Sequence, residues 1–196
     1  MIRTLFTLII AVGMWNIGLA QTAYEITSSK LTIAGTSNLH DWESNATQVN
    51  ASGDLALEGS TLKSIKSLTV EIPVKGIKSE KGSIMDKKTW SALKSDSHSK
   101  ITYKLSKATV NSNGTIKATG SLTIAGKTNT IEMDVKGKVL SDGSLQFEGS
   151  KKLSMTDYGI DPPTALMGTM KTGNDVTISF TVKMAPANGA NKTSGK

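Results

Sequence analysis

Apolar and polar residues alternate along most of the chain between residues 24 and 184. The clearest run is residues 67–74, SLTVEIPV, in which every second residue is apolar. Similar runs occur at residues 101–106, 122–124, 131–135 and 176–182. Successive side chains of a β-strand point to opposite faces, so a period of two predicts strands with one buried and one wet face. The pattern therefore predicts an all-β, antiparallel fold.

Short groups of turn-forming residues separate these runs. They are Ser52-Gly53-Asp54, Asn113-Gly114, Ala125-Gly126-Lys127, Ser141-Asp142-Gly143 and Thr172-Gly173-Asn174. Asn-Gly and Asp-Gly readily adopt the positive φ values that tight hairpins need. The spacing predicts about eight strands, which is typical of a closed barrel or a sandwich. A barrel is attractive because closure removes exposed strand edges.

Residues 83–94, SIMDKKTWSALK, interrupt the alternation. Their apolar residues lie nearer to helical spacing, at Ile84, Met85, Trp90 and Leu93. Ser83 is followed three residues later by Asp86, which is a weak form of the capping box that begins many helices. This stretch therefore predicts a short helix lying against the barrel, in a position to close one end.

Residues 1–20 have the pattern of a signal peptide. Arg3 precedes an apolar run, and the segment ends in the small residues Gly18 and Ala20, as signal peptidase requires. The apolar run is too short to cross a bilayer comfortably, so no stable membrane span is expected. Cleavage near Ala20 predicts a periplasmic or secreted protein.

The mature protein is expected to be one domain, residues 21–184. The chain contains no cysteine, which suits a compartment that oxidises thiols. A domain of this length buries enough surface for a stable core without disulfides or metals. Residues 185–196 show no periodicity, and they are expected to form a disordered tail.

The net charge of +7 comes from 23 Lys and Arg against 16 Asp and Glu. Arg3 is the only arginine, and the lysines are spread singly through the alternating stretches. Arginine is the usual residue for paired hydrogen bonds to phosphate or guanine. The charge therefore indicates solvated faces and protected strand edges, and no nucleic acid is expected as a partner.

His40, Asp41 and Trp42 are the first candidates for chemistry. No metal site is expected, because the chain has no cysteine and its only other histidine, His98, is distant in sequence. Adjacent residues of a strand point to opposite faces, so Asp41 would not orient His40 for catalysis. Alternation instead places His40 and Trp42 on one face, where they would fill the barrel end or line its mouth.

Further large or flexible side chains are candidates for a ligand wall or, equally, for core. They are Met85, Trp90 and Leu93 on the helical insert, and Tyr103, Met133, Phe147, Met155 and Tyr158 on the strands. The flexible thioether of methionine suits a variable apolar guest. Residues 157–173 are irregular and contain Pro162-Pro163, so they would serve either as a lid over the barrel mouth or as a plain crossover.

Four segments, in order, resemble one family of exported proteins. They are SKLTIAGTSNLHDWES, VEIPVKGIKSEKGSIMDKKTWSALKSDSHSKITYKL, GSLTIAGKTNTIEMDV, and KLSMTDYGI followed by a strand ending FTVKM. On these segments the chain resembles the YceI-like family. The resemblance implies an eight-stranded antiparallel lipocalin-like β-barrel whose bore holds a long apolar chain, in some members a polyisoprenoid. It implies neither an enzyme nor a cofactor.

Two hypotheses of different classes follow. In the first, the protein is a non-enzymatic exported binding protein that holds a polyisoprenoid or fatty-acid-like molecule, with His40, Trp42 and the residues named above on the bore and mouth. In the second, it is a structural or interaction module of the cell envelope whose core is filled by its own side chains. A homodimer is left open by the sequence.

Overall fold

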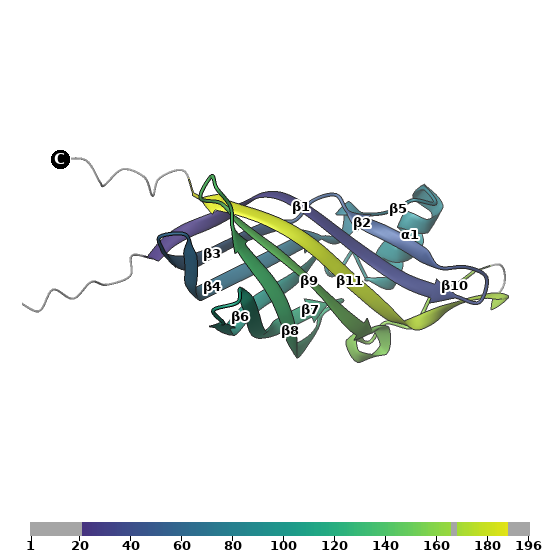
Figure 1. The fold of residues 1–196 in the computed structure, drawn as a ribbon. Helices are drawn as coiled ribbons and strands as arrows, with labels where there is room; N and C mark the ends of the chain where they lie inside the picture. The colour runs from purple at the N-terminus through teal and green to yellow at the C-terminus, as the bar shows by residue number, and fades with distance from the viewer. Residues whose placement is uncertain (1–20, 166–167, 188–196) are drawn as a thin grey trace, which may run out of the picture.

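The computed structural model describes residues 21–165 and 168–187. The predicted signal peptide, residues 1–20, lies outside the described residues, as do residues 188–196 of the predicted tail. Eight long strands make up most of the molecule (Figure 1): β1 (Gln21–Ser37), β3 (Asn50–Glu58), β4 (Thr61–Pro73), β6 (Lys100–Val110), β7 (Thr115–Ile124), β8 (Lys127–Val139), β9 (Leu145–Ser154) and β11 (Met170–Pro186). The short strands are β2 (Trp42–Ala46), β5 (Ile77–Ser79) and β10 (Thr164–Ala165).

The long strands close into a barrel. Their order is β11-β9-β8-β7-β6-β4-β3-β1, and β1 pairs again with β11 over a register that runs from Tyr24↔Pro186 to Ser37↔Thr172. Every pairing is antiparallel, which confirms the predicted eight-stranded antiparallel barrel and excludes the sandwich. Strand β11 continues to Pro186, so the barrel extends two residues beyond the predicted boundary at Met184.

One half of the barrel is filled by its own side chains. The largest fully buried side chains there are Leu55, Ile116, Leu145 and Met184, and they belong to one apolar cluster. A second cluster, centred on Leu122, Ile131, Leu153 and Tyr158, lies in the other half beside a third, smaller one. The alternation found in the sequence thus places apolar side chains inside the barrel, but these side chains fill the two halves of the barrel unequally.

Three of the predicted turns are confirmed. Ala125 and Gly126 both have positive φ in the β7–β8 hairpin, Gly114 has positive φ in the β6–β7 hairpin before it, and Gly143 has positive φ in the β8–β9 hairpin after it. Asp142 accepts hydrogen bonds from Ser144, and Lys183 pairs with it. These hydrogen bonds hold the pKa of the Asp142 carboxyl well below its usual range. The bond from the Ser144 side chain has the largest effect, and the bond from Lys183 has the second largest.

Two predicted turns are wrong, because the structure places them inside strands. Ser52–Asp54 belongs to β3 and Thr172–Asn174 to β11, and each lies next to a shift in strand register. A Cβ on Gly53 would lie 2.4 Å from the carbonyl oxygen of Ser67. A glycine inside a strand often marks such a close approach of two backbones, and that requirement explains Gly53 better than a turn does.

The helical insert forms helix α1 (Ser83–Ala92), as predicted, at one end of the barrel (Figure 1). Its N-cap is Gly82 and no side chain caps it, so the predicted capping box is wrong. Asp86 is buried and faces the neighbouring strand β5 instead.

The late segment KLSMTDYGI also differs from a simple strand, since β9 ends at Ser154 and residues Met155–Tyr158 form a 3₁₀-helix, η2.

The barrel wall is incomplete between β8 and β9. The two strands pair from Val135↔Gly149 to Val139↔Leu145, and among the described residues no pairing joins 127–134 to 150–154. Figure 1 shows the two strands diverging beyond this point. Side chains bridge the gap: Lys151 Nζ donates to the Glu132 carbonyl oxygen at 2.7 Å, and Asn129 Nδ2 donates to the Asp157 carbonyl oxygen at 2.8 Å.

Replacing Gly53 by alanine is expected to destabilise the barrel by about 1–3 kcal/mol, because the new Cβ meets backbone that cannot rotate away. Gly76→Ala is the control. Its Cβ would meet nothing closer than 3.5 Å, so a change within about 0.5 kcal/mol is expected. Urea unfolding of the two variants measures the difference, and equal midpoints would contradict the close approach at Gly53.

Candidate functional site

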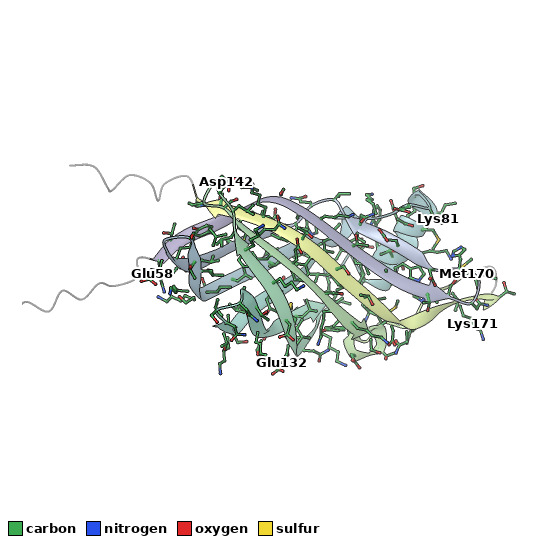
Figure 2. All side chains as sticks on the ribbon, in the orientation of Figure 1. Glu58, Lys81, Glu132, Asp142, Met170 and Lys171 are labelled. Atoms are coloured by element: carbon green, nitrogen blue, oxygen red, sulfur yellow. The ribbon has the colours of Figure 1, made fainter. Side chains whose placement is uncertain are left out.

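A cavity of about 340 Å³ occupies the half of the barrel next to α1. Lys81 and Met170, which line it, lie at the end of the molecule opposite Glu58 and Asp142 (Figure 2). Its wall is mostly aliphatic, with hydroxyl groups and a few basic side chains. The principal lining residues are Ile33, His40, Trp42, Ser44, Ile77, Ser79, Lys81, Met85, Lys88, Thr89, Leu93, Ile101, Ile124, Leu153, Met155, Tyr158, Ile160, Met170, Val176 and Ile178.

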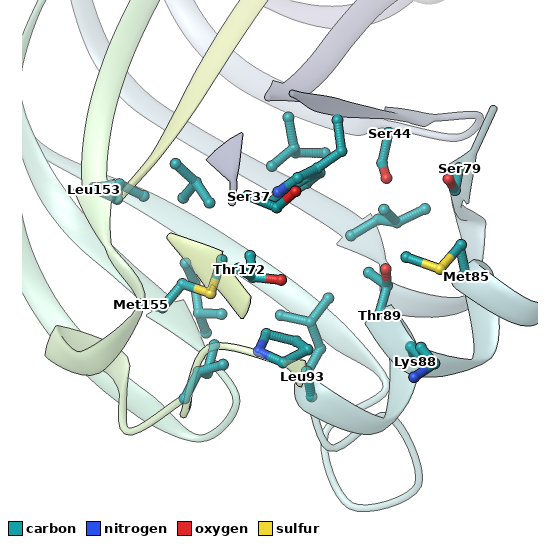
Figure 3. A pocket seen from close by; sticks show the side chains of 18 of the residues that line it. Ser37, Ser44, Ser79, Met85, Lys88, Thr89, Leu93, Leu153, Met155 and Thr172 are labelled. Atoms are coloured by element: carbon teal, nitrogen blue, oxygen red, sulfur yellow. The ribbon is translucent and has the colours of Figure 1, made fainter. Parts of the chain in front are cut away.

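Helix α1 supplies one wall of the cavity. Met85, Thr89 and Leu93 repeat every four residues and therefore lie along one face of the helix, toward the cavity (Figure 3). Asp86 fixes the helix to β5, because its carboxylate accepts from the Ser79 backbone N–H at 2.7 Å and lies 3.3 Å from Lys78 Nζ.

Trp90 supports the same wall from outside the cavity. Its Nε1 donates to the Ile77 carbonyl oxygen at 2.9 Å, and Lys78 Nζ lies 4.2 Å from the centre of its ring. A cation over an indole face is attracted by the ring's electron density. Trp90 and Asp86 together therefore hold the helix and β5 as one unit over the barrel end.

The β1–β2 turn contributes His40 and Trp42 to the cavity wall. Trp42 Nε1 donates to the Thr36 carbonyl oxygen at 3.1 Å, and the indole lies so close to Gly35 that a Cβ there would be 2.4 Å away. Ser37 Oγ donates to the His40 carbonyl oxygen at 2.7 Å and fixes the turn. His40 and Trp42 both line the cavity, as the alternation predicted, although His40 itself precedes β2.

Strand β9 and η2 provide an apolar floor. Leu153 and Met155 lie on the side of the cavity away from Met85 and Thr89 (Figure 3). Tyr158 has only 3% of its surface exposed, and burial raises the pKa of its hydroxyl, so the ring stays neutral at physiological pH. Nothing charged from these two elements faces the cavity.

The structure places the predicted ligand residues in two groups. Six of the ten line the cavity: His40, Trp42, Met85, Leu93, Met155 and Tyr158. The other four, Trp90, Tyr103, Met133 and Phe147, do not line it.

Those four residues have structural positions of a different kind. Phe147 belongs to the apolar cluster of the filled half, and Trp90 braces the helix. The Tyr103 ring lies against Gly120, and burial raises the pKa of its hydroxyl. Met133 packs between the first two clusters and lines a separate outer recess by the gap between β8 and β9. Alternation assigned them an inward face but not a position along the barrel axis.

Several lining residues were not singled out from the sequence. Ile33, Val176 and Ile178 are inward members of alternating runs, so pairing β1 with β11 would have identified them. Ser44 and Ser79 carry no sequence signal, because small polar residues rarely mark an interior. The predicted lid, residues 157–173, contributes Tyr158, Ile160, Pro163, Met170 and Thr172, while residues 166–167 lie outside the described residues.

Within residues 21–165 and 168–187, no three His, Cys, Asp or Glu side chains gather in a way that could hold a metal ion. His98 lies against Gly126, at the β7–β8 turn. No helix in the same ranges is long and apolar enough to cross a membrane.

A closed eight-stranded antiparallel barrel with one filled half and one apolar cavity defines a class by its fold, the lipocalin-like β-barrels. The model of the YceI-like domain matches residues 16–184, and the chain belongs to this family. No curated protein matches the sequence.

Similar solved structures share the fold at low sequence identity. BcnA of Burkholderia cenocepacia has a TM-score of 0.64 and 17% identity, over 80% of this chain and 96% of that one. The YCEI protein of Campylobacter jejuni has a TM-score of 0.59 and 21% identity, over 74% of this chain and 84% of that one. A polyisoprenoid binding domain from Saccharophagus degradans has a TM-score of 0.64 and 12% identity, over 85% of this chain and 99% of that one.

Asp86→Ala is expected to cost about 1–3 kcal/mol, because it leaves the buried Ser79 N–H without an acceptor and removes the partner of Lys78. Asp86→Asn retains an acceptor oxygen and should cost less. Asp96→Ala, which removes an exposed ion pair with Lys75, is the control and should change stability by under about 1 kcal/mol. Urea unfolding and hydrogen exchange across α1 measure these effects, and faster exchange in Asp96→Ala than in Asp86→Ala would contradict the assignment.

Proposed function

We propose that the protein is a non-enzymatic binding protein that holds an apolar or amphiphilic molecule, polyisoprenoid or fatty-acid-like, in the cavity beside α1. The observation that carries this proposal is the contrast between the two halves of the barrel. Leu55, Ile116 and Leu145 fill one half, whereas the other leaves about 340 Å³ between aliphatic walls. Ligand sites commonly measure about 300–1,000 Å³ and are lined mainly by apolar groups.

The size of the cavity sets the affinity that burial of an apolar guest alone can supply. A dry engineered cavity of about 150 Å³ holds benzene, so a volume of about 340 Å³ accommodates roughly a dozen carbon atoms. Each buried methylene contributes about 0.8 kcal/mol, or roughly 8 kcal/mol for ten. Association costs at least about 4 kcal/mol, which leaves at most about 4 kcal/mol, a dissociation constant of about 1 mM, before any polar contact is added. A similar structure, the Saccharophagus degradans domain, is described as polyisoprenoid binding, which supports this class of ligand.

A structural or interaction module is the alternative, and the packed half of the barrel is what favours it. Such a module would need no enclosed volume, and its stability would be the same with or without lipids. The proposal and this alternative therefore differ in one measurable property, the occupancy of the cavity.

Ile178→Trp should reduce ligand binding at least tenfold, because Ile178 lies on the cavity wall and a larger ring would take up the space. Ser179→Trp adds the same group to the exposed face of the same strand and should leave binding unchanged. Farnesol is a suitable probe, and native mass spectrometry reads the fraction of protein that carries it. Failure of the unaltered protein to bind farnesol, dodecanol or any co-purifying lipid would support the interaction module instead.

Export is part of the same proposal. The signal-peptide pattern of residues 1–20 supports it. Full-length chain expressed in a Gram-negative host should be recovered from the periplasm or medium with Gln21 as its first residue, by intact mass. Replacing Ala20 by a bulky residue such as Leu should retain the uncleaved form. Cytoplasmic protein that still carries Met1 would contradict export.

A further inference from the structure

The cationic groups on the cavity wall are not distributed evenly. Hydroxyl groups occur on both sides, with Ser44, Ser79 and Thr89 beside α1 and Thr172 beside Met155 (Figure 3). Lys88 of α1 and Lys81 just before the helix belong to the α1 side, across from Leu153 and Met155. An entirely apolar guest would leave these hydroxyl groups facing hydrocarbon, which costs free energy. The wall therefore fits a molecule with one polar end and one apolar end.

The charged groups on the wall have one sign. Lys81 and Lys88 line the cavity, and no aspartate or glutamate does so among the described residues. Glu80, which precedes Lys81, is exposed and outside the wall, and the buried Asp86 between the two lysines is paired with Lys78. A wall with this charge attracts an anion and disfavours a cation.

The two lysines are free to meet a ligand. Lys88 is half-buried and its Nζ donates to the Thr164 carbonyl oxygen at 3.3 Å, a long bond to a neutral acceptor. Lys81 is exposed, and neither lysine forms an ion pair with a described residue. By contrast, Lys78 on the adjacent strand is committed to Asp86 and Trp90. An anionic head group would therefore gain charge-assisted hydrogen bonds without breaking an existing ion pair.

We propose that the cavity selects a single-chain amphiphile with an anionic head group, a carboxylate or a phosphate, and a tail of about a dozen carbon atoms. Lys81 and Lys88 hold the head, with the hydroxyl groups of Ser79 and Thr89 beside them. The tail runs toward Leu153, Met155 and Ile178. This inference rests on the proposed binding function and adds the chemistry of both ends of the ligand.

Dodecanoate, dodecyl phosphate and dodecanol test the head group, since they share a tail and differ in charge. Trp42 lies on the cavity wall, so its fluorescence reports binding. At low salt we expect both anions to bind the unaltered protein about tenfold more tightly than dodecanol, and high salt should reduce the difference. A preference between the two anions distinguishes a fatty acid from a phosphorylated lipid as the source.

The double variant Lys81→Gln/Lys88→Gln should lose the preference for anions, so that it binds dodecanoate, dodecyl phosphate and dodecanol about equally. Lys171→Gln is the control, because Lys171 lies at the same end of the barrel (Figure 2) but not on the cavity wall. Equal binding of dodecanol and dodecanoate by the unaltered protein would overturn the choice of an anion while the binding function stands. No binding of any of the three would contradict the proposed function itself.

The tail length is tested with saturated fatty acids from octanoate to octadecanoate. Affinity should rise about threefold to fourfold per methylene up to about dodecanoate and then level off, as later carbons remain outside the enclosed volume. A rise that continues unchanged to octadecanoate would overturn the stated length. Ile178→Trp should move the plateau to shorter acids, which separates filling of the cavity from an effect on the head group.

Discussion

The pairing of β1 with β11 is the constraint on which the other features depend. It joins the first and last strands, so each long strand has a pairing partner on both sides. Once the ends are joined, the number of strands sets the width of the interior, and inward side chains alone decide how much of it stays empty. Closure costs chain entropy because the paired residues are far apart in sequence, and the apolar clusters along the axis offset that cost.

The unequal filling of the barrel follows from what points inward in each half. In the packed half, Leu55, Ile116, Phe147 and Met184 meet across the axis. In the other half, β2 and β5 replace part of the barrel wall and bring in the short side chains of Ser44 and Ser79 beside Trp42 and Ile77, while α1 lies across the end. Empty apolar space lowers stability, so its presence in an otherwise packed domain is what the proposed binding function accounts for.

Strand positions and the helical insert could be predicted because they depend on local periodicity. Gly53 and Gly173 could not, since a glycine that permits close contact between strands looks the same in sequence as one that permits a turn. The candidate site was predictable only in part. Alternation assigns Tyr103 and Phe147 to the inward face just as it assigns Ile178, but it contains no information on depth along the axis. Depth is set by the stagger of neighbouring strands, which depends on partners distant in sequence.

The gap between β8 and β9 lies beside the hollow half, next to Ile124 and Leu153 of the cavity wall. Along β7–β8 and β9–β11 the spacing of neighbouring strands is set by long backbone ladders, but here it is set by the rotatable side chains of Lys151 and Asn129. The barrel wall beside the cavity can therefore widen along this line when two side chains move, without the loss of any backbone pairing.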